Sequence, residues 1–154
     1  MNQQWQTFLK SQSATINDAD EASFENGDQL ADCSIFDLSH LRLTSISGED
    51  AEGFLQGQFT NDIRTVSPQH HQMSGYCTPK GRMLANFRIC SNAGKFILQT
   101  PADTQAALIK RLSMFVLRSN VTIEDASDRH VAIGLAGECS PELLKSHFSA
   151  VPAD

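Results

Sequence analysis

Apolar residues recur along this chain with two different periods, and each period predicts a different kind of element. Residues 41–46 and 82–90 alternate between two sets of side chains, as strands with two distinct faces do. Leu108, Leu112 and Phe115 recur every three or four residues, which indicates one face of a helix. Order is expected to begin near residues 33–38. Strands are expected at about 41–46, 72–78, 82–90, 95–100, 121–126 and 130–136, and helices opening near 47, 101 and 140.

Turn and cap residues mark the boundaries of these elements. Ser47 with Asp50 three residues later predicts a capped helix start, and Gly57 predicts a left-handed end of that helix. The sequence Thr78-Pro79-Lys80-Gly81 predicts a hairpin turn between the strands 72–78 and 82–90, because proline and glycine supply the dihedral angles of a tight turn. Thr100-Pro101 predicts a helix start with proline at the first helical position.

The order of elements predicts an α+β domain with a mostly antiparallel sheet covered by helices, because no parallel crossovers of regular length separate the strands. A length of 154 residues suits one domain. Residues 11–31 are polar and acidic and carry no apolar stripe. We therefore expect residues 1–31 to form an acidic arm that is mobile or lies on a surface, and the ordered domain to occupy residues 32–154.

Charge is unevenly distributed. The formal net charge is -6, yet residues 60–118 hold eight basic against two acidic side chains, while the segments on either side are acidic. A basic middle segment of this kind suits a polyanion such as a polyglutamate tail, a phosphate or RNA. Charges that are merely scattered over a solvated surface are the alternative.

The four cysteines, at 33, 77, 90 and 139, form no pair or histidine spacing typical of zinc, so reduced thiols and no metal site are expected. The first ten residues lack the pattern of a secretory signal. No apolar run is long enough to cross a bilayer. These patterns predict a cytoplasmic protein with no membrane contact.

The candidate ligand-binding residues lie in and around the hairpin. Asn86 and Arg88 are two residues apart on one strand and so project from one face, where an amide and a cation suit an anionic heterocycle. Lys80 in the turn would attract an anion, and Tyr76 would stack on a ring. Each also has a structural explanation: a backbone partner for Asn86, solvation for Lys80, and core packing for Tyr76. No spacing indicates a catalytic triad, so no catalytic residue is assigned.

The motifs Phe54-Leu55-Gln56-Gly57-Gln58 with Asn61-Asp62, and Lys80-Gly81-Arg82 followed by Asn86, resemble the YgfZ branch of the folate-binding aminomethyltransferase family. The similarity covers roughly residues 35–137 and about half of a complete family member. It implies the first part of the aminomethyltransferase folate-binding fold, tetrahydrofolate as the cofactor, and a link to iron–sulfur protein maintenance and tRNA modification. It also implies a pterin contact at Met73, although a methionine on a strand is also a common core residue.

One departure bears on the chemistry. In aminomethyltransferases, the resemblance places an aspartate where this chain has Asn86, and an uncharged amide cannot act as a base. The later K-G-C-Y-x-G-Q-E signature of the YgfZ branch is absent. A folate-binding protein that is not catalytic alone is therefore expected, with a homodimer or a missing C-terminal half completing the site.

Two alternatives remain open. The first is a diverged aminomethyltransferase of one-carbon metabolism. The second is a non-enzymatic module that contacts tRNA or an iron–sulfur protein through basic side chains of the middle segment, namely Arg64, Lys80, Arg82, Lys110 and Arg111.

Overall fold

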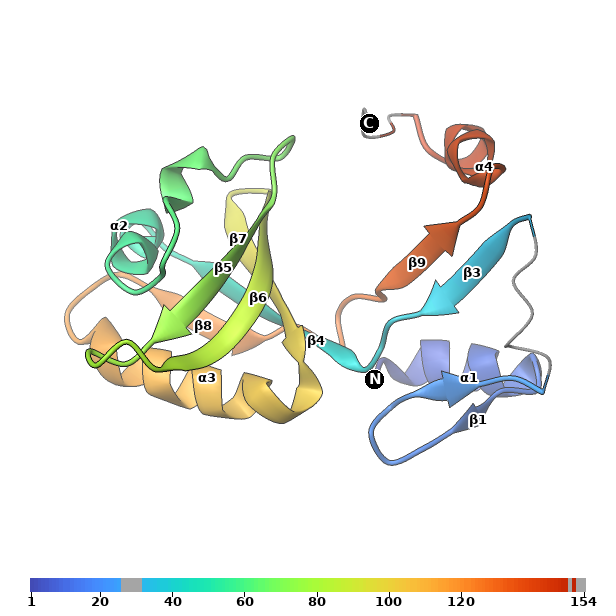
Figure 1. The fold of residues 1–154 in the computed structure, drawn as a ribbon, viewed down its shortest axis with the longest axis horizontal. Coiled ribbons are helices and arrows are strands. Elements are labelled where there is room, and N and C mark those ends of the chain that lie inside the picture. The colour runs from blue at the N-terminus through green and yellow to red at the C-terminus, as the bar shows by residue number, and fades with distance from the viewer. Residues whose placement is uncertain (26–31, 150, 152–154) are drawn as a thin grey trace. The chain divides into compact units, whose positions relative to one another are not determined.

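The computed structural model describes residues 1–25, 32–149 and 151. It divides the chain into two compact units: residues 41–130, which we call the sheet unit, and residues 1–40 with 131–154, which we call the terminal unit. Figure 1 shows the elements of both. The division at residues 40 and 130 differs from the boundary at residue 31 that the sequence predicted, because β3 of the first segment pairs with β9 of the last.

The sheet unit is built on five antiparallel strands in the order β5-β6-β7-β4-β8. This arrangement confirms the predicted α+β class with an antiparallel sheet. The strands are β4 (Leu41–Ser47), β5 (Gln72–Cys77), β6 (Met83–Asn92), β7 (Lys95–Pro101) and β8 (Thr122–Asp125).

Helices α2 (Ala51–Gln56) and α3 (Ala102–Val116) and the short 3-10 helix η1 (Ile63–Thr65) contribute to the core of this unit. Leu55, Ile63 and Leu112 are fully buried against strand residues such as Phe87 and Leu98. Burying each such side chain contributes roughly 1.5–3 kcal/mol. These helices do not cover the opposite face of the sheet at β6, where Asn86 and Arg88 are exposed.

A buried amide joins α3 to the sheet. Gln105 is 5 % exposed, and its Nε2 donates to the carbonyl of Leu43 (2.9 Å), to Oδ1 of Asp125 (3.1 Å) and to Oγ of Ser127 (3.3 Å). Burial acts to raise the pKa of Asp125, but hydrogen bonds from Ser127 and Gln105 and the charge of Arg42 outweigh it and lower that pKa. This network fixes α3 across β4 and the end of β8.

The terminal unit contains structure where the sequence predicted a mobile arm. Its elements are α1 (Gln3–Ser11), β1 (Thr15–Ile16), β2 (Ala22–Ser23), β3 (Ser34–Asp37), β9 (Ile133–Ala136) and α4 (Ser140–His147). The side chain of Asn2 caps α1, and Trp5 Nε1 donates to Oδ1 of Asp37 at 2.7 Å. Residues 3–23 therefore contain a helix and two short strands that the sequence pattern did not indicate, while residues 26–31 lie outside the described part of the chain.

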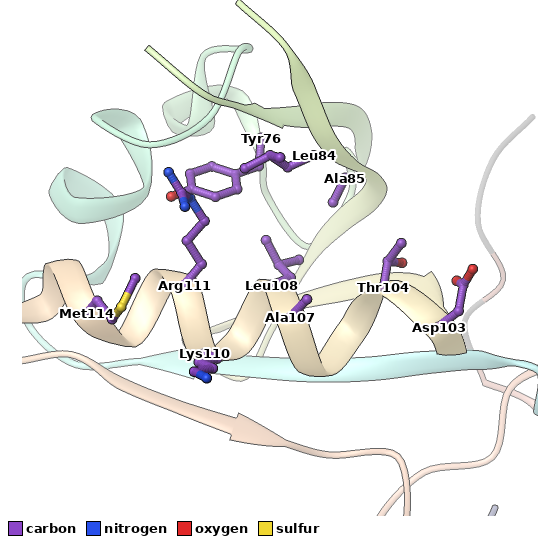
Figure 2. A pocket seen from close by; sticks show the side chains of 10 residues that line it. All are labelled: Tyr76, Leu84, Ala85, Asp103, Thr104, Ala107, Leu108, Lys110, Arg111 and Met114. Atoms are coloured by element: carbon purple, nitrogen blue, oxygen red, sulfur yellow. The ribbon is translucent and has the colours of Figure 1, made fainter. Parts of the chain in front are cut away.

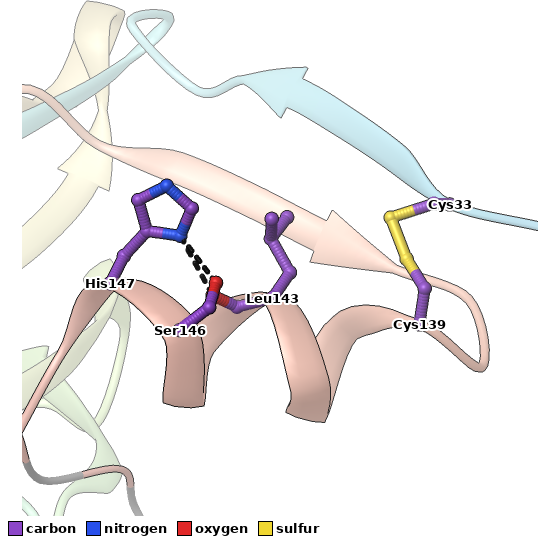
Figure 3. The surroundings of a disulfide bond; sticks show 5 residues. All are labelled: Cys33, Cys139, Leu143, Ser146 and His147. Atoms are coloured by element: carbon purple, nitrogen blue, oxygen red, sulfur yellow. Dashed lines mark hydrogen bonds between the residues drawn. A yellow bond between two sulfur atoms is a disulfide. The ribbon is translucent and has the colours of Figure 1, made fainter.

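A disulfide joins Cys33 to Cys139, with a Cα–Cα distance of 5.5 Å. Figure 3 shows Cys33 beside the start of β3 and Cys139 at the start of α4, which follows β9. The expectation that all thiols are reduced is therefore wrong for this pair, because strand pairing brings together residues 106 positions apart. Cys77 and Cys90 are free.

Three predicted caps also differ. Gly57 has φ -81° and is not left-handed. Neither Ser47 nor Asp50 caps α2 with its side chain; the Asp50 carboxylate instead accepts from the backbone N of Asn120 at 2.7 Å. Pro101 precedes α3 rather than occupying its first helical position. The hairpin turn is as predicted, since Gly81 has φ +79°.

Gly48 is required where the chain leaves β4. It has φ +124°, and an added Cβ would overlap the backbone carbonyl of Asn120. We expect Gly48→Ala to lower the free energy of unfolding by about 2 kcal/mol or more, because both the backbone angle and the clash oppose a side chain. Urea titration followed by circular dichroism measures this change. Gly53→Ala in α2, where an added Cβ meets nothing within 4 Å, is the matched control and should not destabilise.

The disulfide determines how many cysteine thiols react before and after reduction. Protein purified without reductant and unfolded in guanidinium should give two reactive thiols with Ellman's reagent, from Cys77 and Cys90, and four after reduction. Reduction should also destabilise the terminal unit, by roughly 2–4 kcal/mol for a cross-link of this kind. Four thiols before reduction would contradict the pairing.

Candidate functional site

Asn86 and Arg88 lie on one face of β6, as the sequence predicted. The intervening residues Ala85, Phe87 and Ile89 are buried, at 6 %, 1 % and 0 % exposure, while Asn86 and Arg88 are exposed. Alternation along the strand places the two polar side chains on the face opposite the core. Neither side chain makes a hydrogen bond or ion pair with any residue that the structure describes. The side-chain amide of Asn86 thus makes no hydrogen bond with a neighbouring backbone group of the described residues.

Three more residues lie on this surface, two through strand pairing and one through alternation along β6. Met73 of β5 and Gln99 of β7 are both partners of Arg88, and Cys90 follows two positions along β6. Residues opposite each other in a sheet share a face, so these side chains lie beside Arg88. We call this surface the Asn86 face; its members are Met73, Asn86, Arg88, Cys90 and Gln99.

The position next to Asn86 on β5 is a glycine. Gly75 is the register partner of Asn86, and its backbone N–H donates to Oγ1 of Thr60 at 2.9 Å. A Cβ at this position would lie 3.2 Å from Cε of Met83. The side chains of Met83 and Thr60 therefore lie close over the backbone of Gly75, beside Asn86.

Tyr76 and Lys80 do not share the Asn86 face. Tyr76 pairs with Ala85 and is 4 % exposed on the core side, where its ring meets Phe59 edge-on at 6.3 Å. The sequence left ring stacking and core packing open for Tyr76; its burial agrees with core packing, because strand register sends the side chains of Tyr76 and Asn86 to opposite faces. Lys80 is exposed in the turn beyond the ends of both strands.

The Asn86 face can recognise a ligand through hydrogen bonds and one positive charge. Burial raises the pKa of the Cys90 thiol above its ordinary value, and the charge of Arg88 opposes that shift. Cys90 therefore has little thiolate at neutral pH and is a weak nucleophile. In the part of the chain that the structure describes, no group of three or more His, Cys, Asp or Glu side chains could hold a metal.

A cavity of about 410 Å³ lies on the other side of the sheet, between the β5–β6 hairpin and α3. Figure 2 shows Arg111 reaching from α3 toward the ring of Tyr76, with Leu84, Ala85 and Leu108 around the same space. Sequence analysis did not find this cavity, although Gln105 and Arg111 interrupt the helical stripe and are polar signals on an otherwise apolar face.

The basic residues of the middle segment come from several elements. Arg64 forms a bidentate ion pair with Asp62, at 2.8 Å for each bond. Lys80 and Arg82 lie at the hairpin turn, and Lys110 and Arg111 belong to α3.

The sheet with α3 and α2 on one face has the fold of aminomethyltransferases. It is similar to the glycine cleavage system aminomethyltransferase T from Bartonella henselae, with a TM-score of 0.78, 16 % identity, and coverage of 95 % of this chain and 43 % of that one. The model of the GCVT N-terminal domain matches residues 12–154. The chain belongs to the GCVT N-terminal domain family, and the resemblance found from its motifs is confirmed.

Two curated relatives that resemble this chain share the same protein name. The tRNA-modifying protein YgfZ of Enterobacter sp. (strain 638) is 33 % identical over 119 residues, which cover 77 % of this chain and 36 % of that protein. The protein of the same name from Colwellia psychrerythraea is 29 % identical over 124 residues, or 80 % of this chain and 38 % of the relative. The chain thus spans little more than a third of the length of these relatives.

The electrostatic effect of Arg88 on Cys90 can be tested through the pKa of the Cys90 thiol. Alkylation of Cys90 by iodoacetamide, followed by mass spectrometry of its peptide, should reach half its maximal rate at a higher pH than for a free cysteine, because burial raises the pKa of the thiol. Arg88→Ala should move that midpoint higher, because the cation stabilises the thiolate. Arg82→Ala, which removes a cation from the turn, is the control. An unchanged midpoint in Arg88→Ala would mean that Arg88 does not act on Cys90.

Proposed function

We propose that the chain binds a reduced folate on the Asn86 face. The observation that carries this proposal is that Asn86 and Arg88 share one exposed face with no partner among the described residues. An amide can donate to and accept from a pterin ring at once, and a guanidinium attracts a carboxylate of the glutamate end. Met73, which is 54 % exposed beside Arg88, supplies an apolar contact for the ring.

Family membership supports this ligand. The chain belongs to the GCVT N-terminal domain family and has the fold of an aminomethyltransferase, a class for which its motifs imply tetrahydrofolate. The site on this chain is one open sheet face, and pockets that hold small ligands usually enclose most of them. A second copy of the chain or a longer form of the protein would enclose the folate more fully and tighten binding.

We propose a binding role rather than catalysis by this chain alone. Asn86 can hold a pterin but cannot take a proton from it, and the Cys90 thiol is kept protonated by burial. The name of the curated relatives extends the proposal to a role in tRNA modification. A cytoplasmic location and a link to iron–sulfur proteins are proposed with it, as the YgfZ resemblance implies.

Calorimetric titration of tetrahydrofolate into the purified chain tests the site. Asn86→Ala and Arg88→Ala should each weaken binding about tenfold, the loss expected when one good polar contact is removed. Lys110→Ala removes a cation from α3 on the other side of the sheet, and Tyr76→Phe removes only a hydroxyl from the core side. Both controls should bind as the parent does.

A second readout locates the ligand. Tetrahydrofolate on the Asn86 face should slow alkylation of Cys90, which lies on the same side of β6. Folded protein that takes up no tetrahydrofolate would contradict the proposal, and binding that is equally strong in Asn86→Ala and Arg88→Ala would place the folate elsewhere.

A further inference from the structure

The cavity between the hairpin and α3 contains a charged group without a counterpart. Arg111 makes no hydrogen bond or ion pair with any residue in the described part of the chain, and its Nε is buried without an acceptor. Its guanidinium carbon lies 6.0 Å from the ring centroid of Tyr76 and 6.0 Å from that of Phe115. The rings contribute a modest cation–π attraction, but they accept no strong hydrogen bond.

Most of the rest of the lining is apolar, and its other polar members are Asp103, Thr104 and Lys110. Leu84 and Ala85 from β6 face Ala107, Leu108 and Met114 from α3 across the space. The second basic residue of the lining, Lys110, points away from the hairpin, so one guanidinium dominates the charge at this end of the cavity. Asp103 is eight residues earlier on α3, more than two helical turns from Arg111.

The volume and chemistry define the size and charge of a ligand. A space of about 410 Å³ falls in the range of small-molecule pockets, which are mostly apolar with a few polar groups that orient the ligand. A guanidinium presents donors in a planar fork that matches a carboxylate. A dianionic phosphate would need more positive charge than one arginine supplies, whereas a monoanion is balanced by it.

We propose that this cavity is a second binding site, for a small monocarboxylate with an apolar body. The carboxylate pairs with the terminal nitrogens of Arg111, and the apolar body lies between the hairpin and α3 against Ala85 and Leu108. The site is independent of the folate site, because Tyr76 and Ala85 face the core side of the sheet while Asn86 and Arg88 face the other.

The chain offers a single built-in reporter of this site. Tyr76 is the only tyrosine in the sequence, so protein labelled with ring-¹³C tyrosine gives ring signals that need no assignment. The probe is 4-phenylbutyrate, and its neutral analogue 4-phenylbutanamide has the same apolar body. The acid should shift the Tyr76 signals to saturation, and the amide should bind about tenfold more weakly, since it lacks the charge that Arg111 recognises.

Variants separate the charge from the space. Arg111→Gln should lower the affinity for the acid about tenfold and leave that for the amide unchanged. Ala107→Leu, which fills the cavity with a good helix-forming residue and keeps Arg111, should abolish both. Arg88→Gln removes the matched cation from the Asn86 face and should change neither affinity, and Asn86→Ala should likewise have no effect.

Three results would overturn the proposal. The first is the absence of any saturable shift at Tyr76 in the folded parent protein. The second is equal affinity for the acid and the amide, which would leave Arg111 without a role. The third is unchanged binding of the acid in Ala107→Leu, which would place the probe outside the cavity. None of these results depends on whether tetrahydrofolate binds.

Discussion

The register between β5 and β6 is the constraint on which both sites depend. Burial of Ala85, Phe87 and Ile89 fixes which way β6 faces, and Asn86 and Arg88 are exposed as a direct result. Because side chains alternate with a period of two, a shift of one residue would exchange the two sets and send a guanidinium into the core. The turn with Gly81 at positive φ and the irregularity between Tyr76 and Cys77 set this register at the closed end of the hairpin.

One sheet thereby presents two chemically different surfaces, one on each of its faces. The Asn86 face is open and polar, whereas the other face is packed by α2 and α3 and keeps one cavity where Ala85 and Ala107 are small. Gln105 contributes to this arrangement, because its hydrogen bonds to β4 and to Asp125 anchor α3 at one end. The proposed folate site and the proposed carboxylate site are two consequences of the same strand alternation.

Local sequence patterns predicted most of the sheet unit and, in the terminal unit, β9 and α4 but not α1, β1 or β2. Alternation in residues 82–90 and the Pro79–Gly81 turn predicted the hairpin and the shared face of Asn86 and Arg88, because these features depend on neighbouring residues. The choice between ring stacking and core packing for Tyr76 depends on the register across the hairpin, which periodicity within one strand does not specify. The pairing of β3 with β9 and the Cys33–Cys139 disulfide join residues about 100 positions apart, and no local pattern indicates them. Helix α1 was missed because its apolar positions are few, with Leu9 its one buried residue.

The arrangement in which residues 41–130 are inserted between two segments of the terminal unit has a consequence for biosynthesis. The sheet unit is continuous in sequence, so all of its strands are translated before β9 and α4. The terminal unit must wait for its second segment, and only then can β3 find its partner. The Cys33–Cys139 cross-link is therefore a late event that records that the nascent chain has passed residue 139 and that its two outer segments have met.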